Sequence, residues 1–246
     1  MKQVLLIVCC LSCVSVHARE DGKLYAVLVG VSEYRQAKNN LTYSHQDAIE
    51  MYNLLKLQTQ EFNLKLLVNR QATKDHITET TRHLFTKVQP EDRVIFFFSG
   101  HGNRNCFYTH DQALVVDSLQ AIFRECKARW KIILADACFS GTFRASGTEQ
   151  EAPPAREDRD EHVLLFLSSR SDQTSKESQS LKNGLFTYFL MAGLKGGADR
   201  DRDRKVTARE LFDFVHPRVK EQSAGKQVPV MWGQFEDDMV VMNWEK

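Results

Sequence analysis

The sequence has almost no net charge, because its 33 lysine and arginine residues face 32 aspartate and glutamate residues. Proteins that bind nucleic acid or anionic membranes through charge carry a basic excess, so these classes are excluded. Beyond the first twenty residues no apolar run is long enough to span a bilayer, and no internal repeat is visible. With 246 residues, 42% of them hydrophobic and 26% charged, the chain has the composition of one large or two small globular domains.

The first residues have the layout of a secretory signal. Lys2 gives a short positive start, residues 4–14 are almost entirely apolar, and the stretch ends on the small residue Ala18. This layout predicts a signal peptide over residues 1–18 and export to the periplasm or the extracellular space. A first strand or helix is the structural alternative. A lipoprotein signal anchored through Cys13 is another, although Leu11-Ser12 matches that motif only in part.

Cysteine is scarce in the predicted mature chain. Six cysteines are present, and three of them leave with the signal, so Cys106, Cys126 and Cys138 remain. An odd number of cysteines outside the cytosol means that at least one thiol stays reduced or pairs between chains. Cys106 and Cys126 fit either a disulfide or two small buried hydrophobic residues.

Apolar runs and helical patterns alternate along the chain. The runs have the near-continuous character of strands buried on both faces, and they cover residues 24–31, 64–69, 93–99, 131–136, 162–168 and 238–244. Apolar residues at helical spacing occupy residues 44–58, 73–88, 184–195 and 207–219. This alternation predicts an α/β fold with a doubly wound, mostly parallel six-stranded sheet and helices on both faces.

Two unusual loops follow two of these strands. "SGHG" carries His101 and "DACFSG" carries Cys138, each directly after a buried run. The carboxyl ends of parallel strands meet at one edge of the sheet, so His101 and Cys138 are expected to be neighbours. The imidazole can take the thiol proton, and the resulting thiolate can attack a carbonyl carbon. The backbone amides of Gly102 and Cys138 are suited to an oxyanion hole.

Each loop also has a structural interpretation. A single cysteine after a strand is often an inert core residue, and a histidine beside glycines can simply shape a turn. "GHGNRN" lacks the third glycine of a dinucleotide loop, and "GVSEY" is not a serine-hydrolase elbow. His101 and Cys138 have no further ligands at usual spacings, so no zinc site is predicted. The occurrence of both loops at adjacent strand ends favours catalysis.

The motifs "FFFSGHG" and "ILADACFSG" resemble those of the caspase-like cysteine peptidases (peptidase family C14), particularly the bacterial and metacaspase-type branch. Residues 25–48 and 164–190 extend the resemblance over nearly all of the chain after the signal. It implies that His101 is the general base and Cys138 the nucleophile. It also implies one peptidase domain over residues 19–246, with a large-subunit-like part (19–143), a linker (144–161) and a small-subunit-like part (162–246).

The same resemblance implies a substrate class. Animal caspases, which cut after aspartate, have glutamine two residues before the cysteine. This chain has Asp136 there, as do the metacaspases, which cut after arginine or lysine. Matching the metacaspase motif gives a pocket of Ser44, Asp47, Ser99 and Asp136 for the basic side chain of a peptide or protein substrate. The structural alternatives are a helix N-terminal acid for Asp47 and a hydrogen-bonded loop brace for Asp136.

Two polar stretches complete the pattern. "DRDRDRKVTARE" places acids as in a calcium loop, but Arg204 stands where that loop has glycine. Thr207 and Glu210 also fit a capping box that starts a helix; we therefore predict that no cofactor is required and keep calcium as the alternative. The linker is charged and contains prolines, which favours self-processing. An inactive caspase-fold interaction module and a calcium-regulated binding protein are the rival functions.

Overall fold

The computed structural model describes residues 22–103, 105–137, 163–168, 181–233 and 235–245. Cys138, the predicted signal (1–18) and the predicted linker (144–161) lie outside the described residues. Among the helices that the structure describes, none combines the length and the apolar character needed to cross a membrane.

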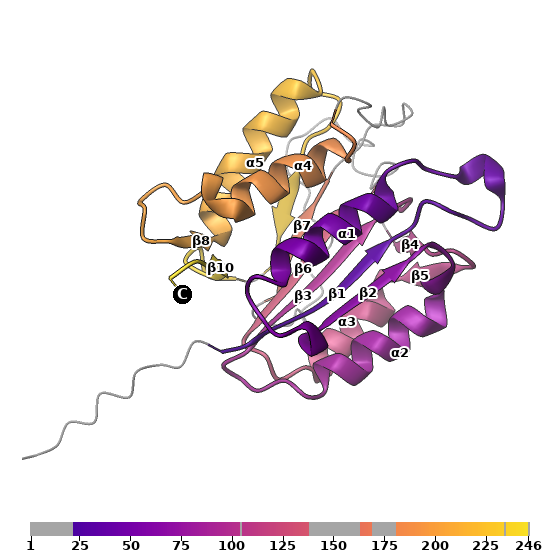
Figure 1. The fold of residues 1–246 in the computed structure, drawn as a ribbon, viewed down its shortest axis with the longest axis horizontal. Helices are drawn as coiled ribbons and strands as arrows, with labels where there is room; N and C mark the ends of the chain where they lie inside the picture. Colours follow the sequence, from indigo (N-terminus) through magenta and orange to yellow (C-terminus); the bar gives the residue numbers. More distant parts are fainter. Residues whose placement is uncertain (1–21, 104, 138–162, 169–180, 234, 246) are drawn as a thin grey trace, which may run out of the picture.

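A six-stranded sheet forms the centre of the fold (Figure 1). Its strands lie in the order β2-β1-β3-β6-β7-β9. Their bounds are β1 Leu24–Gly30, β2 Leu64–Val68, β3 Arg93–Ser99, β6 Trp130–Asp136, β7 Val163–Leu167 and β9 Val230–Trp232. The first five strands pair in parallel and β9 pairs antiparallel with β7, so the predicted mostly parallel sheet is confirmed.

The sixth strand of this sheet is not the one that the sequence indicates. The apolar run at 238–244 does form a strand, β10 (Val240–Asn243), but it pairs with β8 (Lys205–Thr207) in a separate two-stranded sheet. The sixth position belongs instead to β9, whose three residues are all only half-buried. The strand is only three residues long and follows Pro229, so its apolar residues do not form a run of the length expected for a buried strand.

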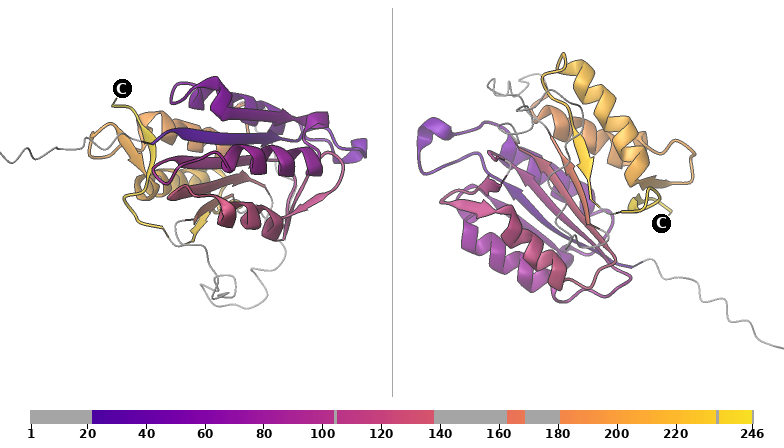
Figure 2. Two further views of the ribbon diagram at one scale, coloured as in Figure 1. Left: turned by 90° about the horizontal axis from the view of Figure 1, so that it is seen from below. Right: turned by 180° about the vertical axis from the view of Figure 1, so that it is seen from behind.

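Helices cover both faces of the sheet (Figures 1 and 2). Their bounds are α1 Ser44–Leu55, α2 Lys74–Phe85, α3 Val116–Glu125, α4 Leu185–Ala192 and α5 Ala208–Gln222. One core joins α1, α4 and α5 to strand residues such as Phe97 and Leu134. The other joins α2 and α3 to residues such as Phe96 and Phe98, so successive strand side chains serve opposite cores.

Local signals explain where several helices begin. The Thr73 side chain accepts a hydrogen bond from His76 N and caps α2. Thr207 and Glu210 form the predicted capping box at the start of α5.

Helix α3 was not predicted, and neither was the hairpin of β4 (Cys106–Tyr108) and β5 (Ala113–Val115) that precedes it.

The two cysteines after the predicted signal that the structure describes are buried thiols. Cys106 and Cys126 are not joined by a disulfide. The Cys106 thiol donates to the Asn103 side-chain oxygen at 3.3 Å. Of the two alternatives left by the sequence, the structure shows Cys106 and Cys126 as small buried hydrophobic residues.

Candidate active site

The carboxyl edge of the sheet positions His101. Ser99 ends β3 and Asp136 ends β6, and these two residues are register partners in adjacent parallel strands. His101 follows two residues after the first strand end, and Cys138 follows two residues after the second. Neighbouring strands are about 4.8 Å apart, so both loops leave the sheet at one point. Cys138 itself lies outside the described residues, which end on this side at the buried Ala137.

Contacts with the loop after β1 hold the His101 ring. Its Nε2 lies 2.9 Å from the carbonyl oxygen of Asn39. A carbonyl oxygen only accepts, so Nε2 carries the hydrogen and the neutral ring has its lone pair on Nδ1. The Tyr34 ring packs against His101 with 5.0 Å between centroids, and the Tyr34 hydroxyl accepts a hydrogen bond from His101 N at 2.8 Å. The imidazole is therefore oriented with one nitrogen ready to accept a proton.

The backbone geometry at Gly102 directs its N–H group away from the paired strand. Gly102 pairs with Phe107 in an isolated antiparallel bridge. The flanking bonds run from Asn103 N to Cys106 O and from Tyr108 N to His101 O, both at 2.9 Å. Gly102 thus stands at a non-hydrogen-bonded position of the pair, where the N–H points away from the partner strand. This geometry leaves the amide for another acceptor.

The predicted pocket acids meet below this edge, on the α1 side of the sheet. Asp47 is only 1% exposed and Asp136 is 0% exposed. Asp47 Oδ2 accepts a 2.7 Å hydrogen bond from the Ser99 hydroxyl. Ser44 is buried at the first position of α1, one turn before Asp47. The structure therefore gathers the four residues at the carboxyl edge, where Asp47 and Asp136 form a buried acid pair and Ser99 donates to Asp47.

The amino end of α4 supplies further hydrogen bonds to this acid pair. Gly184 N donates to Asp47 Oδ1 at 3.0 Å. Thr187 donates to Asp136 Oδ2 through its N–H at 3.2 Å and its hydroxyl at 2.9 Å. A Cβ on Gly184 would lie 2.2 Å from Asp136 Oδ2, so this position requires glycine. Asp136 thus accepts hydrogen bonds that hold the amino end of α4 against the end of β6.

Two polar residues at this site were missed in the sequence. The Asn183 side-chain amide donates to Asp47 Oδ1 at 3.2 Å and to Glu50 Oε2 at 3.0 Å, which links a third carboxylate to the pair. The Asn-Gly step before a helical pattern is the signal that could have drawn attention to Asn183. Glu50 lies one turn after Asp47 on α1, but only the packing of α4 reveals that both face the same neighbour.

Burial and repulsion change the proton affinity of Asp47. Burial raises its pKa from an ordinary 3.8 to about 7, and the nearby charge of Asp136 adds to the increase. Hydrogen bonds from Ser99, Gly184 and Asn183 oppose this shift without cancelling it. At neutral pH the site therefore carries negative charge at a cost in folding free energy, as is common where function needs an unfavourable arrangement.

The Asp47→Asn variant is expected to remove this cost. Because the folded-state pKa of Asp47 exceeds its unfolded value, its contribution to stability is fully present below about pH 4 and is lost as the pH rises to about 7. The variant should therefore match the wild type near pH 4 and exceed its free energy of unfolding at pH 8 by roughly 2–4 kcal/mol. Urea unfolding at both pH values measures the difference. A variant less stable than the wild type at pH 8 would show that the acid pair carries no net strain.

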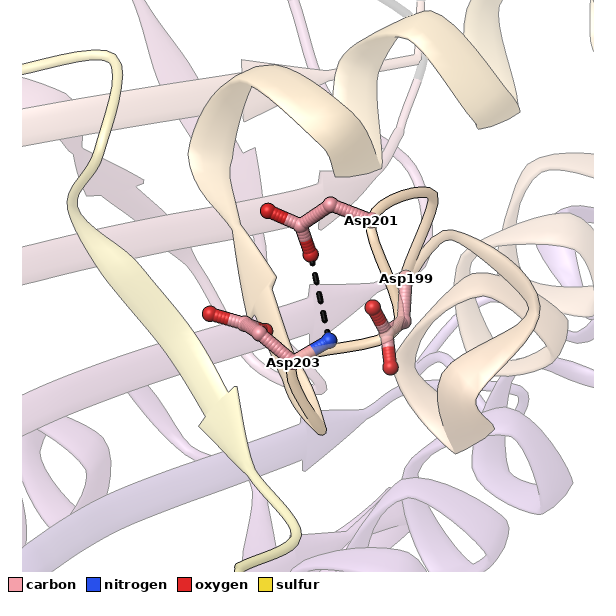
Figure 3. Close-up of side chains that lie close together, drawn as sticks. All are labelled: Asp199, Asp201 and Asp203. Carbon is pink, nitrogen blue, oxygen red and sulfur yellow. Dashed lines mark hydrogen bonds between the residues drawn. The ribbon is translucent and has the colours of Figure 1, made fainter.

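The acidic loop, whose three aspartates are drawn in Figure 3, is separate from this site. Carboxylate oxygens of Asp199, Asp201 and Asp203 lie within 4.8 Å of one another, and one buried oxygen of Asp199 has no hydrogen-bond partner. Both oxygens of Glu210 are used, one by Arg200 N and the other by the capping residue Thr207. The loop follows the carboxyl end of α4, whose amino end is at the acid pair, so it lies at the opposite end of that helix.

An oriented histidine at the carboxyl end of one parallel strand, beside a strand whose sequence leads to a cysteine, is typical of a cysteine hydrolase. The caspase domain family model matches residues 23–240. The chain belongs to this family of cysteine peptidases.

Known proteins agree with this assignment. The chain is 26% identical over 243 residues to Metacaspase-2 of Arabidopsis thaliana; the match covers 78% of the chain and 58% of that longer protein. Caspase-1 of Spodoptera frugiperda has the same fold, with a TM-score of 0.66, 15% identity and 92% of each chain covered. The protein GSU0716 of Geobacter sulfurreducens is also similar, with a TM-score of 0.63, 17% identity, and 88% of this chain and 95% of that one covered.

Proposed function

We propose that this protein is an endopeptidase in which His101 is the general base and Cys138 the nucleophile. The observation that carries the proposal is the Nε2 contact of His101 with Asn39 O at the end of β3, beside the strand that leads to Cys138. The family makes a peptide bond the substrate. A caspase-fold interaction module without activity is the main rival, and the presence of both dyad residues argues against it.

The chemistry follows from the orientation of the imidazole. His101 Nδ1 takes the thiol proton of Cys138, and the sulfur attacks the scissile carbonyl carbon to form a C–S bond. The carbonyl electron pair moves to oxygen, where the N–H groups of Gly102 and Cys138 stabilise the charge by about 3 kcal/mol per donor. Collapse of the intermediate breaks the C–N bond, and the leaving amine takes its proton from His101 Nδ1. Water, deprotonated by the same nitrogen, then hydrolyses the acyl-enzyme.

The substrate residue before the cleaved bond is proposed to be arginine or lysine. Ser44, Asp47, Ser99 and Asp136 would form its pocket. The support is electrostatic, because the pocket combines the two buried acids Asp47 and Asp136 with Glu50, and the donors Ser99, Asn183, Gly184 and Thr187 bring no positive charge to them. A cation in that position relieves the repulsion that raises the pKa of Asp47. To enter the pocket, the guanidinium of a substrate arginine has to replace hydrogen bonds that the amino end of α4 now makes.

We also propose that catalysis requires no metal and that the protein is exported through a signal at residues 1–18. Arg200 N and the capping residue Thr207 already donate to the two oxygens of Glu210, which would be the last ligand of a calcium loop. A cation held by Asp199, Asp201 and Asp203 would stabilise the loop at the far end of α4, distant from His101. Calcium is therefore expected to raise the melting temperature, if it binds, without changing kcat.

One assay separates the candidate functions. Cleavage of an arginine-containing fluorogenic peptide is measured with the wild type and with Cys138→Ala, each with and without EDTA. The proposal predicts cleavage by the wild type alone, at the same rate in EDTA. No cleavage by either protein supports an inactive interaction module, and a wild-type rate that EDTA abolishes and calcium restores supports calcium regulation.

Self-cleavage in the linker (144–161) is a further expected result. The segment offers Arg144, Arg156 and Arg159, the residue type that the proposed pocket prefers, within a polar, proline-containing stretch. The purified wild type should yield two fragments with a new N-terminus within residues 145–160, as identified by N-terminal sequencing, while Cys138→Ala stays whole. If both proteins run as one intact band although the wild type cleaves peptides, the segment is a passive linker.

A further inference from the structure

A hollow of about 680 Å³ opens beside His101. This volume is within the usual range for ligand pockets. Its walls are the loop after β1, the turn at His101 and Gly102, and the β4–β5 hairpin. Most of the lining residues are of polar types, and the lining includes Arg35, Asn39 and Ala113.

Hydrogen bonds between these walls hold the hollow open. His110 Nδ1 lies 2.7 Å from Glu33 O, and Arg35 N donates to His110 O at 3.3 Å, which ties the hairpin turn to the loop after β1. Asp111 accepts bonds from Lys74 N at 2.9 Å and from the Thr109 hydroxyl at 2.8 Å, which ties the same turn to the start of α2. The hollow is therefore preformed, and a ligand would not have to order it.

The hollow and the acid pair lie on opposite sides of the sheet edge. Ser99 and Asp136 continue the alternation of Phe97 and Leu134, which face the core under α1 and α4. The hairpin residues Phe107 and Leu114 pack into the other core, with α2 and α3. His101 stands between the two sides, because it follows Ser99 by two residues along the chain and also lines the hollow.

We infer that this hollow binds the part of the substrate that follows the cleaved bond. The inference rests on the proposed function and extends it. When the C–N bond breaks, the amine has to receive a proton from His101, so the chain attached to that amine passes the imidazole. With the basic side chain held on the acid-pair side, the departing segment continues onto the side where the hollow lies.

The lining indicates which segment fits. Side-chain amides of Gln36, Asn39 and Gln112 can both donate to and accept from a peptide main chain. Burial would raise the pKa of Asp111, but its hydrogen bonds and the charge of Arg35 lower it overall, so an ionised acid already faces Arg35. A hollow with balanced charge and several amides suits an extended main chain with small or polar side chains, and large apolar side chains should fit poorly.

Peptides of increasing length test the inference. All share one sequence up to the cleaved arginine, followed either by a coumarylamide or by one, two or three residues such as Ser-Gly-Ser. We expect kcat/KM to rise by at least ~10-fold as the residues are added, because binding along the hollow contributes only to the longer substrates. Leucine in place of serine should reduce the gain.

A variant locates the effect. Ala113 is exposed on β5 and lines the hollow, so Ala113→Trp should fill it and lower the ratio of extended-peptide to coumarylamide cleavage at least ~5-fold. Leu57→Trp, at a residue 69% exposed and outside the hollow, should keep the wild-type ratio. Equal kcat/KM for all peptide lengths, or an unchanged ratio in Ala113→Trp, would overturn the inference while leaving the proposed function intact. Failure to cleave any of the peptides would overturn the proposed function instead.

Discussion

Replacing Cys138 or His101 by alanine is expected to lower kcat/KM on an arginine-containing peptide by roughly a thousandfold or more. Without the sulfur of Cys138 no acyl-enzyme can form. Without the imidazole of His101 the thiol is rarely deprotonated, so it seldom attacks the substrate. The double variant should lose little beyond either single variant, because the two residues act as one unit. A fluorogenic peptide assay measures all three.

The control for this result is another cysteine. Cys126 is buried in the core with α2 and α3 and is not part of the proposed dyad, so Cys126→Ala should retain the wild-type rate once its folding has been checked by circular dichroism. Near-normal activity in Cys138→Ala would end the assignment of the nucleophile.

Cleavage after arginine or lysine is expected to exceed cleavage after aspartate by at least ~100-fold. A substrate carboxylate would be desolvated against Asp47 and Asp136, and an uncompensated buried charge costs about 3–5 kcal/mol. A guanidinium instead forms charge-assisted, bidentate hydrogen bonds with the same carboxylates. Three fluorogenic peptides that differ only in this residue measure the selectivity.

Variants of the acid pair separate selectivity from folding. Asp47→Asn should lower kcat/KM for the arginine peptide even though its stability at pH 8 is expected to rise, so that unfolding is not the cause of the loss. Asp136→Asn retains an oxygen for the Thr187 donors and should also weaken arginine cleavage. Faster cleavage after aspartate than after arginine by the wild type would show that the pocket is wrongly assigned.

Much of the fold was predictable because the buried strands have near-continuous apolar sequences. Strands β1, β3 and β6 are apolar along nearly their whole length, since both faces are covered, and the alternation of strands and helices predicts that they run parallel. Strand β9 was not predictable in this way: it has three half-buried residues and lies at the edge. The run at 238–244 was correctly predicted as a strand, but the sequence pattern does not say which partner a strand selects.

The candidate site also has a part that the sequence predicts and a part that it does not. The contact between Ser99 and Asp47 joins residues whose positions the family motif specifies, and the strand ends explain why Asp136 is near them. The hydrogen bonds from Asn183 and Thr187 could not be predicted, because they depend on how the amino end of α4 packs against α1 and the end of β6. Nothing in the spacing of residues within one segment encodes such a contact between segments.

Labelling with a peptidyl-arginyl chloromethyl ketone tests the central claim most directly. A reactive thiolate displaces chloride and forms a C–S bond with the inhibitor, and peptide mass spectrometry identifies the modified residue. The account predicts one adduct per chain, on Cys138, with slower labelling in His101→Ala and none by the aspartyl analogue. Labelling of Cys106 or Cys126, or equal labelling by the aspartyl analogue, would contradict it.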